Sequence, residues 1–351
     1  ENFWKWGVRV PVMSAPMAGV SGGRLAAAVC KGGGLGFIAA GHASASSEAN
    51  LDAEINLFRK ATSQLDPKPP LCLGFITYSS LPCIASVLVK YKPDVVQFTA
   101  PGVSQGAGNI AIAREHHISI VMAQVGSIAE AEDAICAGVD VIIAQGTEAG
   151  GHGLRPELGT ATMPLAAAVC SMVKNSQLQD QGPLVLAAGG ISDGRGVAAA
   201  LSLGCDGVSM GTRFFASHQA MGRSEEKQAI VQANADSAIR TRVFDLLNNT
   251  SSANPWPPPY DAAGALHNET SRAWHNQPEA LAQTLEAQGR EGELIKAYRQ
   301  HSGNTSVTAV WMGQGVSDVH EIDDAEALVR RINDEAGEAI ERLRGFVSAP
   351  K

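Results

Sequence analysis

The sequence predicts an α/β fold in which parallel strands, each followed by a helix, close into a (β/α)8 barrel. Three features lead to this prediction. Short apolar runs alternate with helical patterns through residues 1–217, and there are eight such runs. Within a run the apolar residues follow one another without alternating polar ones. This pattern is typical of strands buried on both faces of a parallel sheet.

The eight runs are, in chain order, PVMSAPMAGVS (11–21), GLGFIAAG (34–41), PLCLGFITYS (70–79), DVVQFTAPG (94–102), ISIVMAQVG (118–126), DVIIAQGTEAGG (140–151), PLVLAAGGIS (183–192) and GVSMGTRFFAS (207–217). Segments such as GRLAAAVCKG and DGRGVAAALSLG lie between them, with apolar residues at helical spacing. Eight such units favour a closed TIM barrel, and an open doubly wound sheet is the alternative. In both architectures ligands bind at the carboxyl ends of the strands.

The character of the chain changes after the eighth run. Residues 218–304 are polar and contain the proline-dense stretch SSANPWPPPYD between two amphipathic helical patterns. We expect a helical insertion that packs over one rim of the barrel. The chain then returns to the apolar TAVWMGQGV and ends in a charged helix. The predicted barrel therefore comprises residues 1–217 and 305–351, with residues 218–304 inserted after strand 8.

Composition narrows the classes of function. The net charge is −8 and no stretch clusters lysine and arginine, which argues against nucleic-acid binding. No apolar run is long enough to cross a membrane, and the six cysteines show no C-x-x-C pair. We expect free thiols, no metal site and a cytoplasmic protein. The chain does not begin with Met, so a removed organelle-targeting leader stays open.

Glycines at the ends of the last two strands predict a phosphate site. Gly189 and Gly190 follow strand 7, and Gly211 and Thr212 follow strand 8. In barrels these two loops form a recurrent phosphate cradle, because glycine lets the backbone approach the phosphate oxygens closely. Tight turns alone would also use glycine, but two adjacent strand ends of this kind favour the phosphate site.

His152 is the candidate catalytic residue. It lies in the stretch AQGTEAGGHG, where the surrounding glycines leave room for a ligand on the same rim as the phosphate site. Imidazole titrates near neutral pH, so it can accept a carbon-bound proton or bind an anion. A buried structural histidine is the alternative. Glu148 fits a structural role better than a catalytic one, and His42 is a weaker rim candidate.

The predicted cofactor is a phosphate-bearing one. No G-x-G-x-x-G sequence stands in a βαβ context, so a Rossmann nicotinamide site is not indicated. A phosphate cradle and a histidine at the mouth of an apolar barrel suit flavin mononucleotide, FMN. Its ring would lie over the small residues of SAPMAG at the end of strand 1.

Four motifs carry a family resemblance. APMAG, GTEAGGHG, AAGGISDGRG and MGTRF occur in this order in the nitronate monooxygenase family, formerly called 2-nitropropane dioxygenases. The likeness covers residues 8–217 and the later WMGQGV. It implies an FMN-dependent enzyme on a TIM barrel that oxidises alkyl nitronates, such as propionate 3-nitronate, with O2 to a carbonyl compound and nitrite.

Carried over residue by residue, the resemblance assigns His152 as the catalytic histidine. It leaves open whether His152 acts as a base or only contacts an anionic substrate. The chain departs from many bacterial members at LGFITYSS, where they have an Asn-containing turn, so the pocket near Phe75 is expected to differ. The implied cofactor contacts are Met17, Ala18, Gly19, Phe75, Gln124, Gln145, Gly150, Gly151, Ala188, Gly189, Gly190, Gly211, Thr212 and Gln314.

Four other functions stay open on sequence grounds. A phosphate-sugar isomerase would use the same cradle and would need an acid–base residue at a strand end, for which Glu148 is the one fair candidate. An FMN-dependent NADH:quinone reductase and an FMN-dependent enoyl reductase would use the same fold and cofactor. A non-catalytic barrel that binds a phosphate ligand would need no catalytic histidine. For the oxygenase we expect a small nitronate or nitroalkane and O2 as partners, no nucleic acid or membrane, and a homodimer as the candidate assembly.

Overall fold

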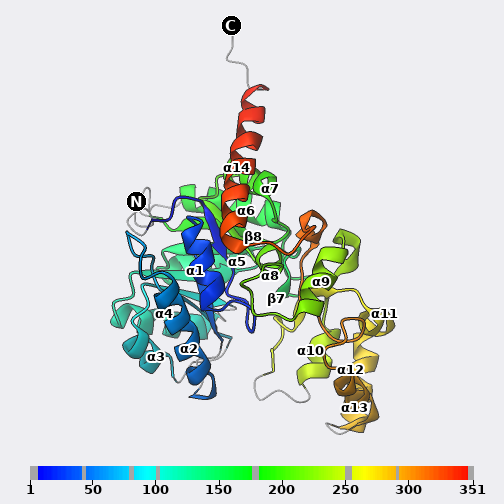
Figure 1. Ribbon diagram of the computed structural model, residues 1–351. Helices are drawn as coiled ribbons and strands as arrows, with labels where there is room; N and C mark the ends of the chain where they lie inside the picture. The colour runs from blue at the N-terminus through cyan, green and yellow to red at the C-terminus, as the bar shows by residue number, and fades with distance from the viewer. Residues whose placement is uncertain are drawn as a thin grey trace.

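The computed structural model describes residues 7–41, 45–78, 83–99, 103–175, 182–249, 255–289 and 292–346. His42 lies outside these residues. Eight parallel strands form a nearly closed barrel with helices around it (Figure 1). The strands are β1 (Val12–Ser14), β2 (Phe37–Gly41), β3 (Cys72–Ile76), β4 (Val95–Thr99), β5 (Ile120–Val125), β6 (Val141–Gln145), β8 (Leu184–Ala188) and β9 (Gly207–Met210).

The order of the strands confirms the TIM barrel. They pair as β1-β9-β8-β6-β5-β4-β3-β2, and each lies within one of the eight predicted runs. A parallel bridge between Met13 and Leu35 brings the two ends of the sheet together, and the Leu35 N–H donates to the Val12 carbonyl over 2.9 Å. An open sheet would leave these edges apart, so the alternative is excluded.

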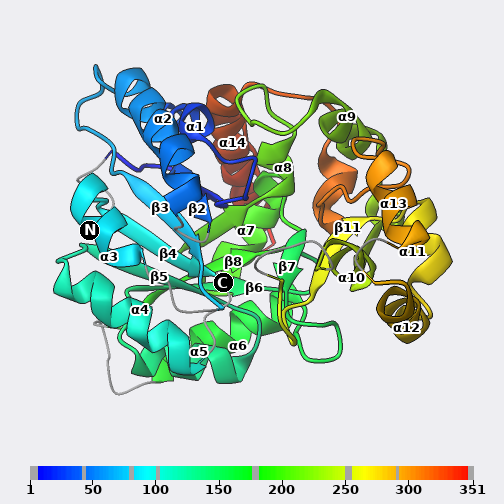
Figure 2. The ribbon, with the colours of Figure 1, turned by 90° about the horizontal axis from the view of Figure 1, so that it is seen from below.

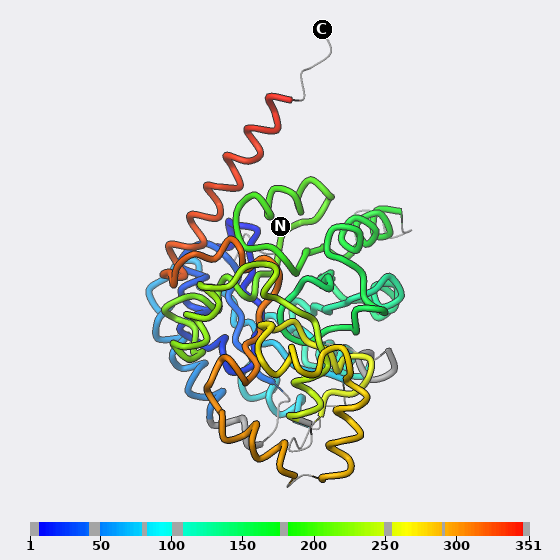
Figure 3. The backbone as a smooth tube through the Cα atoms, turned by 90° about the vertical axis from the view of Figure 1, so that its right-hand side faces the viewer, coloured from blue at the N-terminus to red at the C-terminus, as the bar shows by residue number. Residues whose placement is uncertain are grey.

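Most barrel helices follow their strands, but the eighth comes from the end of the chain. The helix directly after β9 is only the short α8, and α14 packs instead against α7 and α1. This position supports the proposed assignment of residues 305–351 to the barrel. Beyond its contacts with α7 and α1, helix α14 extends away from the barrel (Figures 1 and 3). The barrel helices are α1 (Gly23–Lys31), α2 (Ala45–Ala61), α3 (Ile84–Tyr91), α4 (Val103–Glu115), α5 (Ile128–Cys136), α6 (Thr162–Asn175), α7 (Gly194–Ser202), α8 (Thr212–Phe215) and α14 (Ala325–Arg344).

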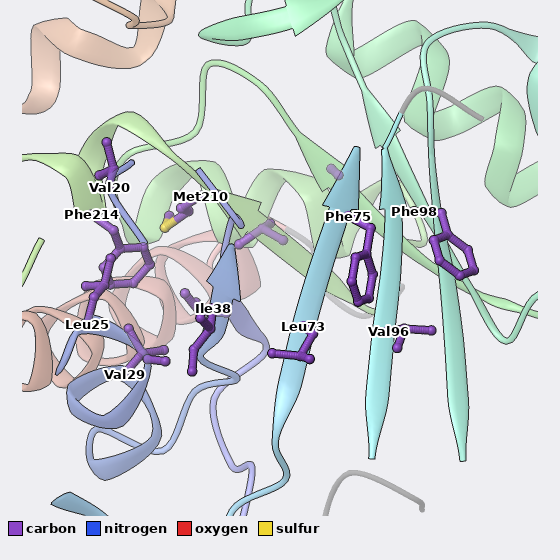
Figure 4. Packing of buried hydrophobic residues seen from close by; sticks show 14 of the residues in the cluster. Val20, Leu25, Val29, Ile38, Leu73, Phe75, Val96, Phe98, Met210 and Phe214 are labelled. Carbon is purple, nitrogen blue, oxygen red and sulfur yellow. The ribbon is translucent and has the colours of Figure 1, made fainter. Parts of the chain in front are cut away.

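The barrel strands separate two hydrophobic layers. One faces the helices and includes Leu73, Val96 and the neighbouring rings of Phe75 and Phe98, whose centroids are 6.1 Å apart (Figure 4). The other fills the barrel with inward-facing side chains such as Val95, Ile120 and Met122. Since successive strand residues face opposite sides, the next inward positions toward the carboxyl ends are polar: Gln97, Thr99, Gln124, Gln145 and Ser209.

Residues 218–304 hold helices, as predicted, and also two strands that the prediction of a helical insertion lacked. Both strands are short, four residues of AIRT and five of AAGAL, and the second is rich in alanine without the β-branched residues that signal a strand. They form a sheet in the order β10-β11-β7, where β7 (Gly151–Gly153) contains His152. The elements are α9 (Ser224–Gln232), η3 (Ala235–Ser237), β10 (Ala238–Thr241), α10 (Val243–Asn249), β11 (Ala262–Leu266), α11 (Glu269–Trp274), α12 (Pro278–Gln288) and α13 (Glu293–Gln300).

The inserted elements gather on one side of the barrel (Figure 2), and α14 points toward the opposite end of the molecule (Figure 3). The 3₁₀ helix η4 (Gln314–Asp318) leads from the insertion back toward α14. Among the described residues, no helix combines the length and apolarity that crossing a membrane requires.

Candidate active site

A cavity of about 240 Å³ opens at the carboxyl ends of the barrel strands. Its wall includes the polar inward-facing layer and the loops that follow β1, β6, β8 and β9. Thirteen of the fifteen predicted site residues line it: Met17, Ala18, Phe75, Gln124, Gln145, Gly150, Gly151, His152, Ala188, Gly189, Gly190, Gly211 and Thr212. The structure thus brings together residues that lie far apart in the sequence.

Two predicted contacts do not line the cavity. Gly19 is exposed in the turn after β1, with a φ of +73°, so the chain has already turned away from the strand end. Gln314 is also exposed; its backbone N–H donates to the Glu148 carbonyl over 2.9 Å, while its neighbours Gly313 and Gly315 line the wall. At both positions the neighbouring residues of the same loop line the cavity instead.

Phe75 lines the cavity in a different way from that expected. Its side chain is buried in the layer between strands and helices, against Phe98. Only the backbone of Phe75 is therefore left to face a ligand. The alternation of side chains along β3 explains this outcome, because Phe75 is one residue out of phase with the inward positions.

The glycine cradle suits a phosphate group. Gly189 and Gly190 have φ values of +111° and +70°, and a Cβ on Gly189 would lie 2.8 Å from Thr162 Oγ1. Outside the strand ladders, neither backbone N–H donates to another group within the described part of the chain. Free N–H groups beside an open cavity are the donors that phosphate oxygens need. These residues therefore fit a phosphate-bearing cofactor.

The polar layer offers further donors. Gln97 Nε2 donates to Gln124 Oε1 over 3.4 Å and to Thr99 Oγ1 over 3.3 Å. Because Gln124 Oε1 accepts this bond, its Nε2 is left to donate to a ligand. Gln145 lies on the neighbouring strand β6, two residues beyond Ile143, the partner of Gln124, and lines the same cavity. The two amides could bind the polar edge of a planar ring.

His152 lies on the cavity wall, with 16% of its side chain exposed. Its backbone is held by β7, where it pairs with Ala263 of β11. Gly150, two residues earlier, packs against the 312–313 backbone, and a Cβ there would lie 2.6 Å from the Met312 carbonyl carbon. Close backbone packing therefore accounts for Gly150, whereas Gly151 has a φ of +69° and open space around it.

A partly buried arginine holds the turn that leads to His152. The Arg240 guanidinium on β10 donates to the carbonyls of Thr147, Ala149 and Ala262 over 3.0, 2.8 and 3.1 Å. Burial lowers the pKa of Arg240 to about 10, and the Glu148 carboxylate opposes this change. Glu148 itself accepts from the Thr162 N–H over 2.8 Å, so it anchors α6, in the structural role that we expected.

Sequence reasoning missed the groups that surround the His152 ring. Asp245 on α10 has its Oδ1 2.7 Å from His152 Nε2. Trp256 stacks on the imidazole with centroids 4.0 Å apart and planes 7° apart, and Trp311 lies tilted at 5.2 Å. Trp311 belongs to WMGQGV, a stretch that the sequence analysis already included in the family resemblance. Nothing in the local sequence around Asp245 indicates that it is a site residue.

Comparison with known proteins identifies the family of the chain. The family model of nitronate monooxygenase matches residues 3–69 and 78–335. A nitronate monooxygenase of Metarhizium robertsii, npaC, is 34% identical over 336 residues, which cover 93% of this chain and 90% of the relative. The chain belongs to the nitronate monooxygenase family. The resemblance inferred from the motifs is confirmed, and the chain is an enzyme of the flavin-dependent oxidoreductase class.

Solved structures extend the likeness to the whole fold of this family member. FabK of Thermotoga maritima superposes with a TM-score of 0.74 at 27% identity and covers 97% of this chain and 96% of its own. A nitroalkane oxidase of Streptomyces ansochromogenes gives a TM-score of 0.72 at 26% identity, covering 96% and 98%.

Proposed function

We propose that the protein is an FMN-dependent nitronate monooxygenase that oxidises alkyl nitronates, such as propionate 3-nitronate, with O2 to a carbonyl compound and nitrite. The observation that carries the proposal is the position of His152, which shares one cavity with the Gly189–Gly190 and Gly211–Thr212 pairs. A group that can accept a proton or bind an anion thus lies beside a site that fits a phosphate-bearing cofactor.

Different residues of the cavity would bind different parts of FMN. Gly189, Gly190, Gly211 and Thr212 would hold the phosphate of FMN, and Met17 and Ala18 would support its ring. Gln124 and Gln145 would bind the polar edge of the ring. When bound, the flavin supplies the electron-transfer chemistry that oxidation of a nitronate by O2 requires.

His152 would act on the substrate. Its ring borders the cavity, while Trp256 and Trp311 cover it with apolar surface. Partial exclusion of water strengthens a hydrogen bond or charge interaction between imidazole and the nitro group. The same surface would favour substrates with small apolar substituents.

The test replaces His152 by Asn, which removes the base and keeps a polar side chain of moderate size. We expect His152→Asn to retain FMN, as judged by its absorbance spectrum, and to lose about 10²- to 10⁴-fold in turnover of nitroethane, measured as nitrite release with catalase and superoxide dismutase present. His301→Asn, an exposed histidine on the insertion, is the matched control and should have wild-type activity. Unchanged turnover in His152→Asn would contradict the assigned role.

Stopped-flow mixing with NADH separates the reductases that the sequence left open. The proposed oxygenase should leave the flavin oxidised under anaerobic conditions. Rapid bleaching by NADH would instead favour a reductase, and absence of a bound flavin would favour a phosphate-ligand binder.

A further inference from the structure

We propose that Asp245 is a positioning residue that keeps the proton of the neutral His152 imidazole on Nε2, so that Nδ1 is the atom that accepts the proton from a nitroalkane. This inference rests on the proposed function and specifies which ring nitrogen of the imidazole accepts the proton. It also assigns a role in the reaction to the inserted segment, because Asp245 lies on α10.

The hydrogen bond decides where the proton lies. Asp245 Oδ1 is 2.7 Å from His152 Nε2, and the Asp245 side chain is only 4% exposed. An ionised carboxylate can only accept hydrogen bonds, so the imidazole nitrogen that faces it must donate. The neutral ring then carries its lone pair on Nδ1. The same arrangement, in which a buried carboxylate selects the histidine tautomer, is known from hydrolase triads.

The packing around the ring holds Nε2 toward Asp245 and opposes a 180° flip, which would put Cε1 in the place of Nε2. Trp256 lies parallel to the imidazole at 4.0 Å, and Trp311 packs against it at 5.2 Å. The backbone of His152 is fixed by its pairing with Ala263. A ring flip would turn Nε2 away from Asp245 and leave a buried carboxylate without its histidine partner, which is costly.

The surroundings of Asp245 contain no competing cation in the described part of the chain. His152 is the only basic group paired with Asp245 there. Asp245 Oδ2 is buried and has no hydrogen-bond partner among the described residues. The phenols of Tyr78 and Tyr298 lie near enough for the Asp245 charge to act on them; burial and then this charge raise the pKa of Tyr78 to about 12. Both phenols stay neutral and therefore do not compete with the His152 imidazolium for the negative charge of Asp245.

The proposed step is a proton transfer with no change of oxidation state. The C–H bond next to the nitro group breaks, and its proton forms an N–H bond at His152 Nδ1. The electron pair of the C–H bond moves into the C=N bond of the nitronate, and one nitro oxygen takes the negative charge. His152 becomes an imidazolium, which keeps its Nε2–H on the Asp245 carboxylate.

Asp245→Asn tests the inference because the two side chains have the same shape. The asparagine amide can donate to Nε2, which moves the histidine proton to Nδ1 and removes the base. With the holoenzyme we expect the kcat for nitroethane to fall about 10³- to 10⁴-fold, as for the equivalent change in a hydrolase triad, with KM within threefold of wild type. Preformed ethyl nitronate needs no base, so its kcat should fall less than tenfold.

Asp52→Asn provides a matched control. Asp52 pairs with Lys90 on the exposed outer surface over 2.9 Å, away from the cavity. The same chemical change there should leave both substrates unaffected. A wild-type rate for nitroethane in Asp245→Asn, or equal losses with both substrates, would overturn the inference.

A second measurement does not depend on the stability of any variant. In wild-type holoenzyme labelled with ¹⁵N-histidine, the neutral His152 should show a protonated Nε2 and an unprotonated Nδ1, assigned by comparison with His152→Asn. The opposite tautomer would refute the role of Asp245. If wild type fails to oxidise ethyl nitronate, the proposed function is wrong, whereas the NMR result still decides between the two tautomers.

Discussion

Gly211→Ala should separate cofactor binding from folding. Gly211 has a φ of −102°, which alanine adopts without strain. A Cβ there would lie 3.6 Å from Met17 Sδ and 3.8 Å from Ala15 Cβ, at ordinary van der Waals distances. The free energy of unfolding should therefore stay within about 1 kcal/mol of wild type, and the lower entropy of the unfolded chain favours a slight gain.

The effect on FMN should be larger. Both atoms nearest to the added methyl group belong to residues that line the cavity, so the methyl takes space where the backbone would approach the cofactor. Excess volume at a well-packed contact costs about 1–3 kcal/mol, which corresponds to a rise in the Kd for FMN of about 5- to 150-fold. Titration of the apoprotein, followed by quenching of FMN fluorescence, measures this Kd.

The control is Gly337→Ala on α14, where an added Cβ meets nothing within 4 Å. It should leave the Kd unchanged and raise helix stability slightly. If Gly211→Ala folds and binds FMN as tightly as wild type, Gly211 does not contact the cofactor and the phosphate cradle must be placed elsewhere.

Two further predictions concern the loops around His152. Arg240→Met should lower the free energy of unfolding by about 2–4 kcal/mol in urea titrations, because three carbonyls lose a charged donor; a loss below 1 kcal/mol would show that water replaces it. Burial alone would raise the pKa of Asp261, but its pairs with Arg155 and Arg242 bring that pKa below its usual value. The stability from these pairs is therefore present above the unfolded-state pKa and lost as the pH falls through the folded-state pKa. Asp261→Asn should cost about 1–3 kcal/mol at pH 7, and the difference from wild type should shrink below about pH 4 in guanidinium titrations; a gap independent of pH would contradict this origin.

Local chemistry made most of the barrel predictable. Strands buried on both faces need continuous apolar runs, so IVMA and VIIA predict β5 and β6 without any tertiary information. The same logic places His152 and the glycine pairs at one rim, because parallel strands end on the same side. The short strands β10 and β11 escaped prediction, since β11 pairs with β7 on one side and with β10 on the other, and this pairing supplies the order that their own side chains do not.

The sequence by itself determined the barrel, the rim on which the site lies and the histidine at its edge, because each depends on residues close together in the chain. Only the tertiary structure decided what surrounds that histidine. Asp245 is 93 residues from His152, and Trp256 comes from the proline-rich stretch of the insertion. No periodicity encodes such contacts, since they arise from the way the insertion folds back over the barrel. The same reason separates Gln314, which faces solvent, from its glycine neighbours on the cavity wall.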